Sequence, residues 1–168
     1  AIDVNHSVYK SAVSIPYLMF SQYQNGDFER VLNADPRHFA AYAVSNCKIK
    51  VRNQFFRLIS KYKQIDHLAR DCIHGKSPKM KDRFNEATFL TSVRQAFRAY
   101  KFAIVFENQA RPGYITEKLM NAYLSGAVPI YFGAPDIFKF VNANATIICK
   151  PPRYACIDRI KAVDGSDS

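Results

Sequence analysis

The chain has 168 residues, of which 48% are apolar and 23% are charged, a balance typical of a single globular domain with a hydrophobic core. It contains no apolar stretch near the roughly 20 residues that a bilayer-spanning helix needs, and its first ten residues lack the features of a signal peptide. The net charge of +10 favours a phosphorylated ligand, a polyanion or an anionic membrane surface as partner.

The first part of the chain shows no sustained periodicity. Residues 14–20 could form one short strand, and Asp35-Pro36 ends the segment. We expect residues 1–36 to be an extension that connects this chain to a preceding domain, and residues 37–168 to form one domain. Because an initiator Met is lacking, we also expect the chain to be a piece of a longer protein.

From His38 onward, predicted strands and helices alternate. The predicted strands are 39–44, 64–66, 102–106, 128–132 and 146–149, and the predicted helices are 52–62, 86–98, 115–125 and 135–140. A loop is expected over 67–83, and residues 164–168 are expected to be disordered. Five strands with intervening helices predict a Rossmann-like α/β fold, a doubly wound parallel sheet.

The segment from Tyr100 to Gly133 is predicted to be one strand–helix–strand unit, with Gly126 ending its helix. Apolar positions such as Leu119 and Ala122 fall on one side of that helix. Glu117, Lys118, Asn121 and Ser125 fall on the other side. The loop before the helix is expected at the carboxyl edge of the sheet, where α/β folds bind ligands.

That loop and the helix start carry four polar side chains with complementary chemistry. A helix N-terminus attracts anions, and Lys118 in the first turn adds a full positive charge. Glu117 can accept hydrogen bonds from ribose hydroxyls, while Asn108 and Tyr114 offer directional hydrogen bonds. The set suits a sugar diphosphate. The alternative is that Glu117 and Lys118 solvate an exposed helix face and that Tyr114 simply packs.

Several other site types lack support in the sequence. Neither a G-x-G-x-x-G dinucleotide fingerprint nor a complete G-x-x-x-x-G-K-[ST] phosphate loop is present, because Arg70 stands where that pattern needs the first glycine before Gly75-Lys76-Ser77. Without a D-x-D pair, we expect no metal on a diphosphate, so cationic side chains must neutralise it. The basic residues are dispersed and accompany no zinc-finger or RNA-binding motif. A nucleic-acid partner is therefore not expected, and remains only an alternative.

The four cysteines show no metal-site spacing. Cys47 and Cys149 adjoin apolar runs and are expected to be small core residues. A Cys149–Cys156 disulfide is one option that the sequence leaves open. The sequons at Asn5 and Asn144 are compatible with secretory passage, but the compartment stays open.

Two stretches resemble a known family. FENQARPGYITEKLMNAYLSGAVPIYFGAP closely resembles the signature of the α-1,3-fucosyltransferases: FEN, a short spacer, Y-[IV]-T-E-K, then A, G and VP. Upstream, HFAAYAVSNCKIKVRNQFFRLISKYKQID is similar to the family's other shared stretch, in which an apolar strand and S-N precede R-N-x-F-F at a helix start. The matching segments cover roughly residues 39–135.

The resemblance implies the C-terminal, donor-binding half of a GT-B type glycosyltransferase. Such enzymes transfer L-fucose from GDP-β-L-fucose, with inversion, to a GlcNAc or glucose hydroxyl of an acceptor glycan in α-1,3 linkage. They need GDP-fucose as donor substrate and no metal or other cofactor. The family's catalytic base lies in an N-terminal domain that nothing in this chain matches. No catalytic residue is therefore assigned, and Glu107 is interpreted as a structural acceptor that fixes the loop.

By the same resemblance, each motif residue takes a role in donor binding. Arg52 and Lys118, neither on a predicted core face, would hold the diphosphate, and Glu117 would bind the ribose. Tyr114 would line the nucleotide pocket, and Asn108 would touch donor phosphate or sugar. Weaker candidates are Asn46, Asn53 and Arg111.

Two matters stay open from the sequence. The chain could instead be a non-catalytic module that binds a nucleotide sugar or a partner and lacks the acceptor domain. The location implied is the Golgi lumen or membrane for a eukaryotic protein, with a parent that could be membrane-anchored, and the cytoplasm for a bacterial or viral one.

Overall fold

The computed structural model describes residues 38–44, 46, 48–68 and 93–165, and within these the chain forms a five-stranded sheet in the order β2-β1-β3-β4-β5. The strands are β1 (His38–Tyr42), β2 (Ile65–His67), β3 (Tyr100–Phe106), β4 (Val128–Phe132) and β5 (Ile147–Ile148). Every neighbouring pair is parallel. This confirms the predicted doubly wound parallel sheet.

Strand β3 lies at the centre of the sheet, and its sequence explains why. Ile104 pairs with Tyr42 of β1 on one side and with Ile130 of β4 on the other. A central parallel strand is covered on both faces, so it needs a continuous apolar run rather than alternation. The run from Phe102 to Phe106 meets this need, with all five residues buried.

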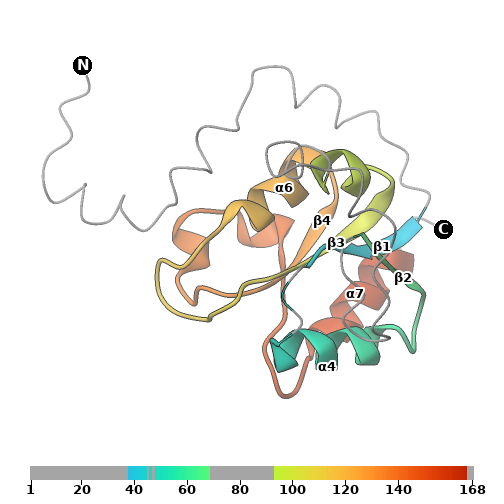
Figure 1. Cartoon of the computed structure of the whole chain (residues 1–168), viewed down its shortest axis with the longest axis horizontal. Coiled ribbons are helices and arrows are strands. Elements are labelled where there is room, and N and C mark those ends of the chain that lie inside the picture. The colour runs from blue at the N-terminus through green and yellow to red at the C-terminus, as the bar shows by residue number, and fades with distance from the viewer. Residues whose placement is uncertain (1–37, 45, 47, 69–92, 166–168) are drawn as a thin grey trace, which may run out of the picture.

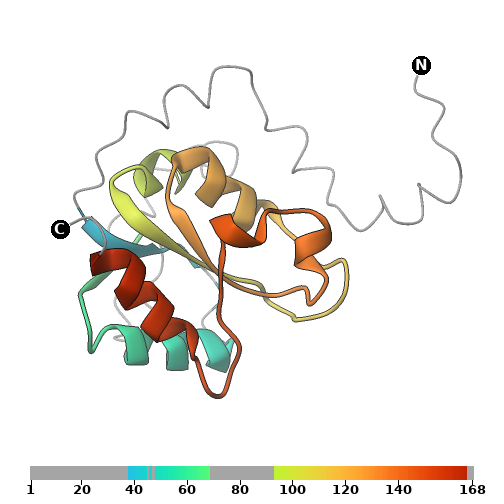
Figure 2. The same cartoon turned by 180° about the vertical axis from the view of Figure 1, so that it is seen from behind.

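Helices cover both faces of the sheet (Figures 1 and 2). α4 (Lys50–Ile59) and α7 (Cys156–Gly165) lie on one face, whereas α6 (Glu117–Ser125) and the helical residues 93–97 lie on the other. The two faces have separate hydrophobic cores, one around Phe55 and Ile160 and the other around Phe97 and Leu119. Two short 3₁₀ turns, η2 (Ile137–Lys139) and η3 (Ala143–Ala145), precede β5. None of the described helices is long and apolar enough to cross a membrane.

The helix boundary predicted at Gly126 is confirmed. Gly126 has the left-handed φ of 85° that favours glycine, and its N–H donates to the Tyr123 carbonyl. The predicted polar face of this helix is wrong in part, because Asn121 and Ser125 are only 2% and 1% exposed. Asn121 faces a cavity that Val93 and Phe97 also line, so residues outside the local pattern cover that side of the helix.

The C-terminal end differs most from expectation. Residues 164 and 165 belong to α7, whereas disorder was predicted from residue 164. Asp164 accepts hydrogen bonds from the Tyr62 hydroxyl (2.8 Å) and from the Lys63 ammonium (2.5 Å). α7 is held in place by Ile160, which is fully buried, and by these contacts with residues about 100 positions earlier, none of which a local sequence pattern can show.

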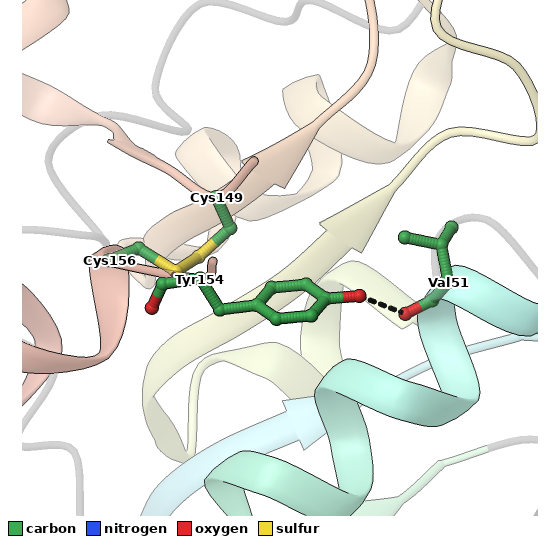
Figure 3. The surroundings of a disulfide bond; sticks show 4 residues. All are labelled: Val51, Cys149, Tyr154 and Cys156. Atoms are coloured by element: carbon green, nitrogen blue, oxygen red, sulfur yellow. Dashed lines mark hydrogen bonds between the residues drawn. A yellow bond between two sulfur atoms is a disulfide. The ribbon is translucent and has the colours of Figure 1, made fainter. Parts of the chain in front are cut away.

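Cys149 and Cys156 form a disulfide with their Cα atoms 5.1 Å apart (Figure 3). The bond joins the end of β5 to the start of α7. Cys149 is thus fully buried as predicted. In addition to its core contacts, it is covalently bonded to Cys156. The expectations for residues 1–37, for Cys47 and Cys72 and for most of the helix predicted over 86–98 lie outside the described residues.

Candidate functional site

The site lies where the winding of the sheet reverses. From β1 the chain goes first to β2 on one side and then to β3 on the other, so the β1–β3 border is the topological switch point. Ligands of open α/β sheets bind outside the carboxyl ends of the strands at such a point. A cavity of about 150 Å³ lies there, lined by the ends of β1 and β3, by Arg52 of α4 and by Glu117 and Lys118 of α6.

Arg52 lines this cavity and is buried, with only 2% of its surface exposed. Its Nε and Nη2 atoms donate to the Phe106 carbonyl at 3.0 and 2.6 Å, and Nη2 also donates to Asn108 Oδ1 at 2.5 Å. Burial lowers the pKa of Arg52, although Tyr42, Glu107 and Tyr114 act to raise it. Arg52 therefore ties the first turn of α4 to the end of β3.

The expectation that Arg52 avoids the core face is wrong. It precedes Phe55 and Phe56 by three and four residues, so all three share one side of α4. Phe55 and Phe56 are 0% and 5% exposed, and that side faces the sheet. The guanidinium tolerates burial because it is hydrogen-bonded there to a carbonyl and to a side-chain amide.

Glu107 has no exposed surface, and its carboxylate is occupied by the loop itself. Glu107 Oε1 accepts from the Thr116 N–H at 2.8 Å, both of its oxygens accept from the Thr116 hydroxyl, and Lys118 Nζ lies 3.3 Å from Oε2. A Cβ on Gly133 would stand 2.6 Å from Glu107 Cγ, so only glycine fits beside it. These contacts support the structural role expected for Glu107, since they fix the loop of residues 107–116.

Lys118 and Glu117 begin α6 and both face the cavity. Lys118 Nζ donates to the Thr116 hydroxyl at 2.8 Å and lies 3.5 Å from Glu117 Oε1, while 24% of its side chain stays exposed. Because Glu107 is saturated by its own partners, Glu117 is the carboxylate open to a ligand. The site thus offers two cations and a helix N-terminus to an anion, with one accessible carboxylate for neutral hydroxyls.

The structure brings four of the five predicted residues to this cavity: Arg52, Asn108, Glu117 and Lys118. Tyr114 does not line it; instead its half-buried ring lies beside the Arg111 guanidinium, 5.1 Å from the ring centre. Of the weaker candidates, Asn46 lines the cavity, whereas Asn53 and Arg111 do not.

Asn121 lines the cavity but was not predicted as a site residue. Its position four residues after Glu117 and three after Lys118 was the available signal, because such residues share a helix side. In the part of the chain that the structure describes, no group of three or more His, Cys, Asp or Glu side chains is arranged to hold a metal ion.

Comparison with known proteins gives a consistent result. Residues 34–151 match the family described as glycosyltransferase family 10 (fucosyltransferase), C-terminal part. The chain is 30% identical over 118 residues to the alpha-(1,3)-fucosyltransferase FucT of Helicobacter pylori, an alignment that covers 68% of this chain and 22% of that protein. It is 32% identical over 111 residues to GDP-fucose protein O-fucosyltransferase 3 of Xenopus laevis, covering 64% of this chain and 23% of that protein.

The fold also matches a crystal structure of an alpha1,3-fucosyltransferase with GDP-fucose, with a TM-score of 0.65 and 27% identity. That match covers 84% of this chain and 40% of the other. The chain spans about a quarter or less of the length of the curated relatives it matches.

Proposed function

Because this chain belongs to glycosyltransferase family 10, the fucosyltransferases, we propose that it is the donor-binding domain of a GDP-fucose-dependent fucosyltransferase. Residues 37–168 form this domain, and residues 1–36 connect it to an N-terminal acceptor domain. The observation that carries the proposal is the meeting of Arg52, Asn108, Glu117 and Lys118 at one cavity beside the topological switch point. Three separate segments of the chain supply these four residues.

The diphosphate of the donor would lie between Arg52 and Lys118. Arg52 Nη2 is engaged by Phe106 and Asn108, whereas among the described residues Nη1 has only a 3.5 Å contact with the Asn46 carbonyl, so Nη1 can turn to a phosphate oxygen. Lys118 Nζ stands at the N-terminus of α6, where the helix dipole also favours an anion.

The remaining donor contacts follow from the same arrangement. Glu117 accepts from the ribose hydroxyls, and Asn108, held through its Oδ1 by Arg52, keeps its amide N–H groups for phosphate or fucose. Tyr114, stacked on Arg111, would close the nucleotide pocket from outside the cavity. The cavity of about 150 Å³ is below the usual size of a ligand pocket, about 300–1,000 Å³, so part of the donor must extend beyond it.

The reaction we propose is transfer of L-fucose with inversion to a GlcNAc or glucose hydroxyl of an acceptor glycan in α-1,3 linkage. As the bond to fucose breaks, GDP gains negative charge, which Arg52 and Lys118 stabilise without a metal ion or other cofactor. A base must take the proton of the acceptor hydroxyl. The family resemblance places this base in the acceptor domain, and the two carboxylates next to the cavity agree with that, since Glu107 is fully hydrogen-bonded and Glu117 is assigned to the ribose.

We assign the cellular location of the enzyme by the kind of organism that makes it. In a eukaryote we place it in the Golgi lumen, on a parent that could be membrane-anchored, and in a bacterium or virus in the cytoplasm. The Cys149–Cys156 disulfide favours an oxidising compartment and hence the first location.

Calorimetric titration of the 168-residue chain with GDP and UDP tests the donor assignment. We expect GDP and GDP-fucose to bind, UDP to bind more weakly, and the chelator EDTA to leave GDP binding unchanged. Equal affinity for UDP, or loss of GDP binding in EDTA, would contradict the assignment.

A radiolabelled GDP-fucose assay with an N-acetyllactosamine acceptor tests whether donor binding and the catalytic base are supplied by different domains. The isolated chain should transfer little or no fucose, because the catalytic base belongs to the missing domain. Robust transfer by the chain alone would place the base among its own carboxylates. Donor binding without transfer in any longer form of the protein would favour the alternative, a non-catalytic nucleotide-sugar-binding module.

A further inference from the structure

Asn121 is a buried polar residue whose side chain faces the donor cavity. It lies in the second turn of α6 with 2% of its surface exposed, and it lines the cavity. No hydrogen bond of its side-chain amide is found among the residues that the structure describes. Ser125, buried on the same helix, differs in that its hydroxyl donates to the Ala122 carbonyl at 2.6 Å.

The side-chain amide of Asn121 is open to whatever occupies the cavity. Its nitrogen and oxygen are not among the described side-chain atoms that are both fully enclosed and without a hydrogen-bond partner, so both atoms border the open space of the cavity. The amide of Asn121 offers two N–H donors and one carbonyl acceptor to whatever occupies the cavity. The folded chain therefore presents an unsatisfied donor–acceptor pair to the ligand that binds here.

The place of Asn121 on α6 indicates which part of the ligand it meets. Asn121 follows Glu117 by four residues and Lys118 by three, so the three side chains form one row along the helix. One helical turn, about 5.4 Å, separates Asn121 from the charged pair at the N-terminus. A nucleotide with its diphosphate at Lys118 and its ribose at Glu117 would bring its base toward the second turn.

The walls of the cavity around Asn121 are suited to a flat, largely apolar group. Besides the charged residues, the lining includes Ala43, Val44, Val93 and Phe97, from β1's end and the helical residues 93–97. Apolar walls with one convergent amide are typical of a site that encloses a ring and forms hydrogen bonds with the polar edge of that ring.

We propose that Asn121 is a base-recognition residue of the donor site, whose amide hydrogen-bonds the edge of the nucleotide base. This inference rests on the proposed function, since the base in question is the guanine of GDP-fucose. The guanine edge carries an O6 acceptor beside N–H donors, which match the amide's own donor and acceptor. The phosphates are held separately, by Arg52 and Lys118.

The test compares two ligands that share the diphosphate but not the base. Calorimetry measures the dissociation constants of GDP and of inorganic pyrophosphate for the wild-type chain, for Asn121→Leu and for Ser125→Ala as the matched control. We expect Asn121→Leu to weaken GDP binding about tenfold, as for the loss of one or two hydrogen bonds, and to leave pyrophosphate binding within about twofold. Ser125→Ala should change neither.

A second measurement does not depend on the stability of the leucine variant. In a nitrogen-15 correlation spectrum, the side-chain amide signal of Asn121, identified by its absence in Asn121→Asp, should shift on addition of GDP and not of pyrophosphate. No shift with GDP, or equal losses of GDP and pyrophosphate binding in Asn121→Leu, would overturn the role of Asn121 in base recognition but leave the proposed function standing. Failure of the wild-type chain to bind GDP would overturn the proposed function together with this inference.

Discussion

The hydroxyl of Tyr154 donates to the carbonyl oxygen of Val51 at 3.2 Å, which joins the disulfide-closed loop after β5 to the first turn of α4 (Figure 3). The Tyr154 ring also packs on Phe55, with the ring centres 5.6 Å apart. Its backbone has a φ of 43°, a left-handed value that is uncommon for a tyrosine. Because Arg52 follows Val51 directly, this loop supports the turn that carries a cation of the donor site.

Replacing both cysteines, as Cys149→Ala/Cys156→Ala, should lower the free energy of unfolding by about 2–3 kcal/mol, the chain-entropy value for a loop this short. Substitution is preferable to a reducing agent, which would act on every cysteine of the chain. Urea denaturation followed by circular dichroism gives the measurement. The control Tyr154→Phe removes only one hydrogen bond and should cost about 1 kcal/mol. Unchanged stability of the double variant would show that the disulfide does not support the fold.

Arg52→Ala should destabilise the fold as well as the site. It leaves the buried Phe106 carbonyl and the Asn108 side chain without their donor, so we expect a loss of about 1–3 kcal/mol in unfolding free energy. Arg52→Lys keeps the charge but cannot bond both partners in the same way, so it should recover only part of that stability. Chemical denaturation distinguishes these outcomes, and a fully stable Arg52→Ala variant would contradict the structural role.

Lys118→Met should weaken GDP binding by about 1.5–3 kcal/mol, the usual contribution of a charge-assisted hydrogen bond. The effect on melting temperature should be small, because the side chain is partly exposed and Glu107 keeps its bonds to Thr116. Lys139→Met, an exposed lysine of η2 that follows the carboxyl end of β4, is the matched control and should bind GDP normally. Equal GDP affinities for the two variants would place the diphosphate elsewhere.

Neutralising the two carboxylates next to the cavity should affect different properties: protein stability for Glu107 and GDP binding for Glu117. Glu107→Gln places an amide N–H₂ group against the Thr116 donors and the Lys118 ammonium, and should lower the unfolding free energy by about 1–3 kcal/mol. Glu117→Gln should leave stability nearly unchanged and weaken GDP binding. Thermal unfolding and calorimetry on both variants make the comparison. A stable Glu107→Gln variant would remove the argument that this carboxylate fixes the loop.

Acid should destabilise the chain partly through Asp164. Burial alone would raise the pKa of this carboxyl group, but hydrogen bonds from Lys63 and Tyr62 outweigh it, and the pKa is lowered. The group therefore contributes stability above its unfolded pKa of about 3.9, and this contribution is lost as the pH falls through the lower folded value. Asp164→Asn should remove this part of the pH dependence of unfolding, whereas Asp158→Asn, on an exposed site of α7, should not. Identical acid-unfolding curves for Asp164→Asn and the wild type would refute the coupling.

The sequence by itself determined the parallel sheet and the chemistry of its carboxyl edge. The apolar run at Phe102–Phe106 and the stop at Gly126 are local signals, because burial on both faces and a left-handed φ each demand particular residues. The spacing of Asn108, Glu117 and Lys118 around the same helix start was equally local. These residues could be placed together without knowing the rest of the fold.

The tertiary structure alone decided which polar side chains are buried and what they bind. Arg52 was expected off the core face, yet it bonds a carbonyl 54 positions away. Asn121 was expected to face outward, yet it lines a cavity shared with residues 93–97. Likewise, α7 is held by Asp164 contacts with Tyr62 and Lys63, about 100 positions earlier. Periodicity describes one helix at a time, whereas burial depends on every element packed against it, so no local pattern could have shown these partners.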